Sequence, residues 1–240
     1  MRKLLAIAAR ELDALFRLPV GWIAIALFVL LTGVVFAQTT LIPGEPATLR
    51  YFFLSSSWML APVAPAISMR LISEEARTGT LEPLVTAPVG DVTIVWGKYL
   101  GAVGFLVLML APTLVFPLVL WGASSPAPDP GPIVTGYLGL VLVGMVYLAV
   151  GTLASALTSS QTLAFLATLI VLALALVLSS GVAEKVDPRI GRVLLAFSVP
   201  LRMRDFARGI VDTSHVVFFV SASVWFVTLA AAALESRRWR

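Results

Sequence analysis

No charged side chain occurs between residues 130 and 183, where the sequence is PGPIVTGYLGLVLVGMVYLAVGTLASALTSSQTLAFLATLIVLALALVLSSGVA. A helix that crosses the hydrocarbon core of a bilayer needs roughly 20 mainly apolar residues. The stretch is too long for one such helix, and the polar residues Thr158, Ser159, Ser160 and Gln161 interrupt it. It therefore predicts two membrane-spanning helices, over about 133–157 and 162–180.

The composition of the whole chain also indicates a membrane protein. Of its 240 residues 59% are hydrophobic and only 12% are charged, about half the share of roughly 25% in average soluble domains. The formal net charge of +4 comes from few residues and predicts no nucleic-acid partner, because positive charge on such a chain more often reports membrane topology. Cysteine is absent, which excludes disulfide and thiolate sites.

Four other apolar stretches are long enough to cross a bilayer, at about 20–41, 52–69, 99–121 and 216–234. We therefore predict an all-α integral membrane protein with six transmembrane helices, a single domain over 1–240 and an external segment over 181–215. The predicted spans contain no Asp, Glu, Lys, Arg or His. Since ion-driven transporters usually carry ionisable residues at depth, a secondary transporter is not expected.

The first 18 residues are predicted to form an amphipathic helix that Pro19 ends. One face carries the apolar residues Leu5, Leu12, Leu15 and Phe16. The other face carries the charged residues Arg10, Asp13 and Arg17. This pattern suits a helix that lies in the membrane interface and turns into the first span. A merely polar N-terminal extension is the alternative.

Basic residues predict on which side of the membrane the termini lie. With six spans, both termini share one side with the charged loop 70–98, and that side carries ten Lys and Arg residues against seven on the other. Because cytoplasmic segments hold the excess of positive charge, we expect the termini and this loop in the cytoplasm and the protein in the inner membrane. The segment 184–215 carries six of the seven opposing charges and breaks the rule locally.

Residue types exclude several kinds of catalytic site. An ATP-binding P-loop ends in Gly-Lys-Ser/Thr, whereas Tyr99 follows the only Gly-Lys pair, Gly97-Lys98. A zinc site of the HExxH type needs two histidines, and His215 is the only histidine. We interpret it as an interfacial polar residue rather than the base of an intramembrane hydrolase. The chain is therefore predicted to be no enzyme and to hold no catalytic, cofactor or metal site.

The densest group of charges lies in the segment 70–89, RLISEEARTGTLEPLVTAPV, which joins the second and third predicted spans. Apolar side chains there could fill a groove on a soluble motor protein, and the charges could fix the register. The apolar residues are Ile72, Leu81, Leu84 and Val85. The charged residues are Glu74, Glu75, Arg77 and Glu82. An ordinary solvated loop would explain the same charges equally well.

The segment 69–102, MRLISEEARTGTLEPLVTAPVGDVTIVWGKYLGA, closely resembles the signature of type-2 ABC exporter permeases. The resemblance implies a cytoplasmic coupling helix within 70–98 that docks onto a separate ATPase subunit. It assigns the coupling role to Arg70, Glu74, Glu75, Arg77, Gly79, Thr80, Leu81, Glu82 and Leu84, and Pro88, Gly97 and Lys98 complete the matching positions. Pro83 departs from the Leu or Met common there, so the limits of this helix are open.

Both ends of the chain extend the resemblance. The segment 8–22, AARELDALFRLPVGW, is similar to the amphipathic elbow helix of these permeases. The segment 203–221, MRDFARGIVDTSHVVFFVS, is similar to the external segment before the last span in the gliding-motility branch. Similar permeases also serve nitrous-oxide reductase maturation.

The resemblance implies the membrane subunit of an ATP-driven ABC exporter. Its partners would be two ABC ATPase subunits, which hold ATP and magnesium, a second permease copy or a close homologue, and the lipid bilayer. Close contact between helices could occur at small residues such as Gly97, Gly101 and Gly104. Two alternatives remain open: a scaffold or mechanotransmission subunit of an ATPase-driven assembly, and a passive channel or scramblase. The sequence assigns no substrate-binding residue.

Overall fold

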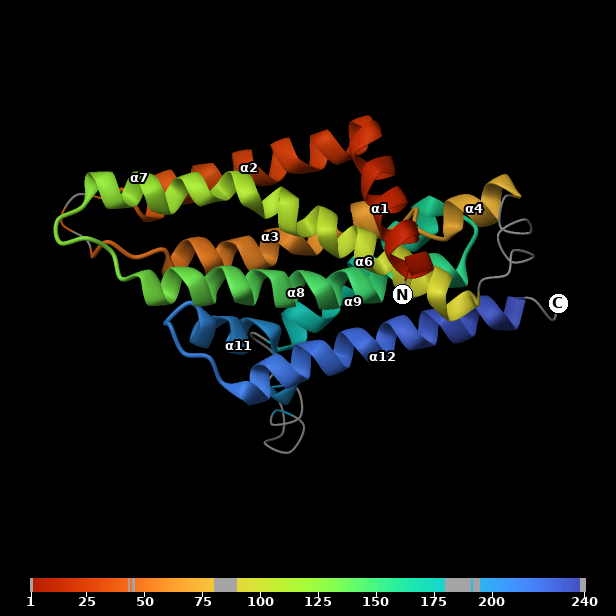
Figure 1. Cartoon of the computed structure of the whole chain (residues 1–240). Helices are drawn as coiled ribbons and strands as arrows, with labels where there is room; N and C mark the ends of the chain where they lie inside the picture. The colour runs from red at the N-terminus through yellow and green to blue at the C-terminus, as the bar shows by residue number, and fades with distance from the viewer. Residues whose placement is uncertain are drawn as a thin grey trace.

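The computed structural model describes residues 2–42, 44, 46–79, 90–179, 191 and 195–237, and these residues form helices and the connections between them (Figure 1). The long helices are α2 (Pro19–Thr39), α3 (Arg50–Ser68), α6 (Asp91–Leu110), α8 (Pro130–Leu157), α9 (Gln161–Val177) and α12 (Thr213–Arg237). The shorter ones are α1 (Arg2–Arg17), α4 (Ser73–Thr78), η1 (Ala111–Leu114), α7 (Val115–Ala123) and α11 (Val199–Phe206).

Five helical stretches of the described chain are long and apolar enough to cross a membrane. They contain α2, α3, α6 with α7, α8, and α12, and each overlaps one predicted span. The apolar helix α9 covers most of the remaining predicted span but is only 17 residues long. The count of six spans therefore stays a prediction.

The third span differs most from the prediction. Its helix begins at Asp91 rather than near residue 99, so Lys98 lies inside the helix and not before it. At the other end α6 tightens into the 3₁₀ turn η1 at Pro112 and continues as α7. A proline inside a helix removes a backbone donor and crowds the preceding turn. The Tyr137 hydroxyl donates to the Thr113 carbonyl at 2.8 Å and fixes this turn against α8.

Helix α8 lies at the centre of the bundle and contacts α3, α6, α9, α11 and α12. Its neighbours come very close at glycines. A Cβ atom on Gly136 would lie 2.3 Å from the Phe53 ring of α3, and one on Gly144 would lie 2.4 Å from Leu106 of α6. Both distances are impossible for real side chains, so the tight packing of the core depends on these glycines.

Figure 1 shows how the elements divide between the two ends of the bundle. Helices α1 and α4 lie at one end, together with the end of α12. The connections from α2 to α3 and from α7 to α8 lie at the opposite end. The N-terminal and loop charges of the sequence therefore meet at one end, although the chain separates them.

Candidate functional site

The turn that leads from α3 into α4 is fixed against α8 by Ser155. The Ser155 hydroxyl accepts hydrogen bonds from the backbone N–H groups of Ile72 and Ser73 at 3.1 and 3.0 Å, and donates to the Met69 carbonyl at 3.0 Å. Leu71 and Ile72 are fully buried beside it. Ile72 was predicted to fill a groove on a partner, and this prediction is wrong because the side chain belongs to the chain's own core.

Helix α4 is short because Gly79 ends it in the left-handed region, at φ 72°. A glycine adopts this conformation without the steric cost that a Cβ atom brings. Glu74 and Glu75 lie in the first turn, where carboxylates favour a helix N-terminus. The Arg70 Nε donates to Glu74 at 2.9 Å, and Arg77 is exposed to its surroundings.

A buried group of charges, here named the Lys98 cluster, joins three helices. It consists of Lys98 on α6, Glu11 on α1, Glu75 on α4 and Arg10 on α1. The Lys98 Nζ lies 2.9 Å from a carboxylate oxygen of Glu11 and 2.9 Å from one of Glu75. Arg10 approaches the same Glu75 oxygen at 3.6 Å.

The burial of this cluster makes it costly to break. The Lys98 side chain is 3% exposed, Glu11 13% and Glu75 17%, whereas Arg10 is 63% exposed. A buried ammonium group is tolerated only when opposite charges and hydrogen bonds replace its water. Two cations face two carboxylates here, so the formal charge of the cluster is zero. Loss of Lys98 would leave the Glu11 carboxylate without the cation that it contacts and Glu75 with Arg10 alone.

Two glycines on α6 allow α1 to come close enough to form the cluster. A Cβ atom on Gly97 would lie 2.7 Å from the Ile7 side chain, and one on Gly101 would lie 2.7 Å from the Ala8 carbonyl oxygen. At Gly104 the nearest atom would be a Leu12 methyl at an ordinary 3.7 Å. The expected close helix contact therefore occurs at Gly97 and Gly101, and within one chain.

A hollow of about 290 Å³ lies beside the cluster, between α1 and α4. Charged residues line it, with Arg70 and Glu74 on one side and Arg10 and Glu11 on the other. Every charge of the hollow has an opposite charge within 4 Å. Among the described residues, the hollow therefore offers no isolated charge that would attract an ionic ligand.

The structure brings together only part of the predicted coupling residues. Arg70, Glu74, Glu75, Arg77 and Gly79 lie at or beside α4. Thr80, Leu81, Glu82 and Leu84 fall outside the described residues, as do Pro83, Val85 and Pro88. Sequence reasoning missed the link between Lys98 and Glu11, although both lie in segments chosen for their resemblance.

A second group of charges, here named the His215 cluster, joins α11 and α12. The Arg202 Nη1 lies 2.8 Å from the His215 Nδ1, and the His215 Nε2 lies 2.8 Å from an Asp205 oxygen. Arginine can only donate, so Nδ1 is the acceptor and Nε2 carries the proton that bonds Asp205. Both ring nitrogens are thus occupied, which argues against His215 as the base of a hydrolase. The prediction of a merely interfacial polar residue missed these two bonds.

Arg202 anchors this cluster to its surroundings. Its guanidinium carbon lies 3.9 Å from the centre of the Phe218 ring, and its Nη2 donates to the Ala196 carbonyl at 2.6 Å. Partial burial lowers the pKa of Arg202, and the charge of Asp212 opposes this shift. The cation is therefore held by an aromatic face, a carbonyl and the imidazole together.

The segment that joins α11 to α12 contains one residue that ends α11 and one that caps the start of α12. Gly209 has φ 89°, and its N–H bonds the Phe206 carbonyl at 3.1 Å, which ends α11. Asp212 accepts the Ser214 N–H at 2.7 Å just before the first turn of α12. Within the segment 203–221, Gly209 thus coincides with a helix end and Asp212 with a helix start.

Comparison with known proteins identifies the family. No curated protein matches the chain. The model of the family described as "ABC-2 family transporter protein" matches residues 38–197, which is two thirds of the chain. This segment includes α3, α4, α6 and α8, with the Lys98 and Glu75 of the buried cluster. The chain belongs to the ABC-2 family of membrane transporter proteins.

Proposed function

We propose that this chain is the permease subunit of an ATP-driven exporter and that a separate ABC ATPase supplies the energy. The observation that carries the proposal is the Lys98 cluster, which ties α4 to both α1 and α6. Family membership supports the role of a membrane subunit. ATP and magnesium would bind in the partner, since this sequence lacks a P-loop.

A push on α4 would reach several spans at once. The turn before α4 continues directly from α3, and Ser155 joins it to α8. Glu75 carries the displacement to Lys98 on α6, and Lys98 carries it to Glu11 on α1. Closely packed helices respond to such a push by shifting as units rather than by bending continuously. The ATPase cycle would thereby alternate the packing of the spans.

The arrangement of the ends supports a cytoplasmic position for α1 and α4. The start of α1, helix α4 and the end of α12 share one end of the bundle (Figure 1). The proposal therefore includes an even number of crossings, with α9 as the sixth. Two copies of the chain, each with one ATPase, would then present two α4 segments to the motor. The gliding-motility or nitrous-oxide-maturation branch remains the proposed relationship within the family.

Co-purification with the ATPase tests the proposal. We expect the chain to pull down the ABC ATPase that is encoded with it and to stimulate its activity in lipid vesicles. Leu81→Ala with Leu84→Ala should weaken this association about tenfold or more, since each buried leucine contributes roughly 1.5–3 kcal/mol. Leu118→Ala on α7, at the opposite end of the bundle, is the matched control because this leucine is 63% exposed.

Two results would contradict the proposal. If the double variant binds and stimulates the ATPase as the unchanged chain does, the segment after α4 is not the coupling element. If vesicles that contain only the purified chain transport a cargo without any ATPase, the chain is a passive channel or scramblase.

A further inference from the structure

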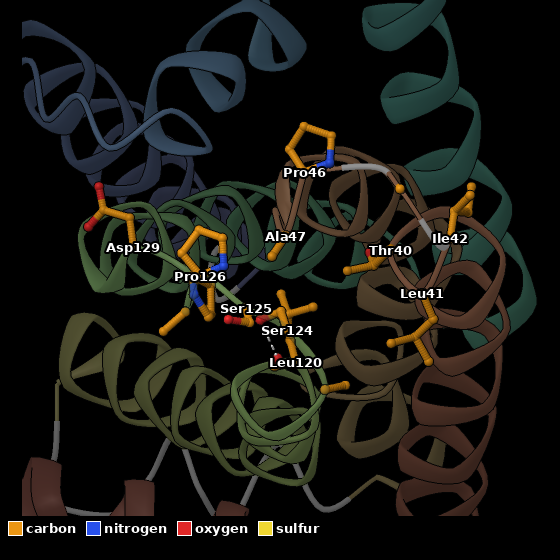
Figure 2. Close-up of a pocket in the computed structure, with 14 residues that line it drawn as sticks. Thr40, Leu41, Ile42, Pro46, Ala47, Leu120, Ser124, Ser125, Pro126 and Asp129 are labelled. Carbon is orange, nitrogen blue, oxygen red and sulfur yellow. Dashed lines mark hydrogen bonds between the residues drawn. The ribbon is translucent and has the colours of Figure 1, made fainter.

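A cavity lies at the end of the bundle opposite α4, between the connections of the spans. Its volume is about 630 Å³, within the range of about 300–1,000 Å³ that small-molecule sites occupy. The connection from α2 to α3 forms one wall, and the connection from α7 to α8 forms the other. In Figure 2 Thr40, Leu41 and Ile42 lie on one side of the cavity, and Pro126 and Asp129 lie on the other.

Thr40 is an exception among the buried threonines. It is 6% exposed, and its hydroxyl is buried without a hydrogen-bond partner in the described part of the chain. By contrast, Thr32, Thr152 and Thr168 each donate to a carbonyl of the preceding turn at 2.7 Å. A buried polar group without a partner is unfavourable. Because Thr40 lines the cavity, a ligand in the cavity would supply the missing hydrogen bond.

The charges of the cavity wall exclude an anionic head group. Among the described residues that line it, Asp129 is the only charged one, and none is Lys or Arg. One Asp129 oxygen already accepts the Gly131 N–H at 2.9 Å as the cap of α8. A phosphate would therefore meet a carboxylate and no cation. An uncharged head group with hydroxyl groups meets no such repulsion.

Apolar side chains indicate that the ligand also has a hydrocarbon chain. Leu41 and Ile42 are 42% and 45% exposed at the mouth of the cavity. The spans α2 and α7 that end here carry exposed apolar side chains along their length, such as Leu30 and Leu118. A lipid chain that lies along these spans would bring its head group to Thr40.

We propose that this cavity binds the uncharged, hydroxyl-bearing head group of a lipid, with the Thr40 hydroxyl as its anchor. The Ser124 hydroxyl, which donates to the Leu120 carbonyl at 2.7 Å, can still accept a hydrogen bond from the head group. The inference does not rest on the proposed function, because no residue of α1, α4 or α6 is among the described residues that line the cavity.

Thermal unfolding in phosphatidylcholine nanodiscs tests this site, with mono-oleoylglycerol as the probe. We expect the probe to raise the Tm of the unchanged chain, whereas phosphatidylglycerol or free glycerol at the same concentration should not. Thr40→Val should weaken the apparent affinity for the probe about fivefold, the value of one hydrogen bond. It should not lower the Tm without the probe, because the hydroxyl has no partner to lose. Ala47→Trp, which fills the cavity, should abolish the response.

The control is Thr39→Val, one residue earlier. The Thr39 hydroxyl donates to the Val35 carbonyl at 2.8 Å and does not line the cavity, so this variant should keep the full response to the probe. The proposal is overturned if the probe does not raise the Tm, if Thr40→Val and Thr39→Val respond alike, or if phosphatidylglycerol stabilises the chain as strongly as mono-oleoylglycerol. A response to free glycerol alone would reject a lipid and indicate a small polyol.

Discussion

The Lys98 and His215 clusters both hold helices together through charges, but they differ in reach and in chemistry. Lys98 joins α6 to Glu11, a residue 87 positions away in the sequence. His215 bonds Asp205 and Arg202, only 10 and 13 positions away. The first cluster consists of ammonium, guanidinium and carboxylate groups, whereas the centre of the second is an imidazole ring between Arg202 and Asp205. The first cluster therefore holds together helices that are far apart in the sequence, and the second joins two helices that are neighbours in the sequence.

The largest effect should come from Lys98→Met, which removes the centre of the first cluster. Two buried carboxylates would then face each other without Lys98, and only Glu75 would retain Arg10. Breaking a buried ion pair in this way typically costs about 3–5 kcal/mol. We expect a loss of this size in the free energy of unfolding, measured by reversible unfolding in mixed micelles, and release of α1 from α6.

Two further variants separate the charge from the packing. Arg17→Met removes a cation from an exposed pair on α1, at 77% and 58% side-chain exposure, and should cost no more than about 1 kcal/mol. Adding Glu11→Gln and Glu75→Gln to Lys98→Met should recover most of the lost stability, because the one charge then left without a partner, Arg10, is 63% exposed. If the triple variant is less stable than Lys98→Met alone, the cluster does not act through its charges.

The same comparison explains what the sequence could and could not predict. The lengths of the apolar stretches were sufficient to place the five helical stretches of the described chain that are long and apolar enough to cross a membrane, because such a crossing needs a run of about 20 apolar residues. The start of α6 was placed too late because Lys98 was interpreted as the end of a loop. A lysine can lie inside a span when partners neutralise it, and those partners come from α1 and α4.

The candidate site was predicted only as far as local motifs define it. Glu74, Glu75 and Gly79 stand out because their pattern is local and resembles a known signature. The contact of Gly101 with α1 and the bonds of Ser155 to the turn before α4 depend on tertiary packing. Hydrophobic periodicity carries no information about which glycine or serine meets which helix. Such contacts need the three-dimensional arrangement.

A smaller effect is expected at the centre of the second cluster. His215→Ala removes both hydrogen bonds and leaves Arg202 and Asp205 without the imidazole between them. We expect a loss of about 1–3 kcal/mol in the free energy of unfolding, the cost of leaving partly buried polar groups unpaired. His215→Gln offers an acceptor and a donor in one neutral side chain and should recover part of this loss. Equal losses of stability in the two variants would show that the packing of the imidazole ring, and not its hydrogen bonds, stabilises α11.

The smallest effect concerns Asp212, which caps the start of the helix that carries His215. The Ser214 backbone N–H, and then its hydroxyl, hold the pKa of Asp212 below its usual value of 3.8. A carboxylate with a depressed pKa in the folded state stabilises the fold above its unfolded pKa, and this contribution is lost as the pH falls through the folded value. Asp212→Asn keeps a capping oxygen but cannot ionise. The Tm of the variant should therefore lie slightly below that of the unchanged chain near pH 6 and equal it once the pH falls below the depressed pKa. A Tm difference that stays constant from pH 6 to this acid range would mean that the cap acts without its charge. The ionisation of Asp212 would then contribute nothing to the stability of the helix that carries His215.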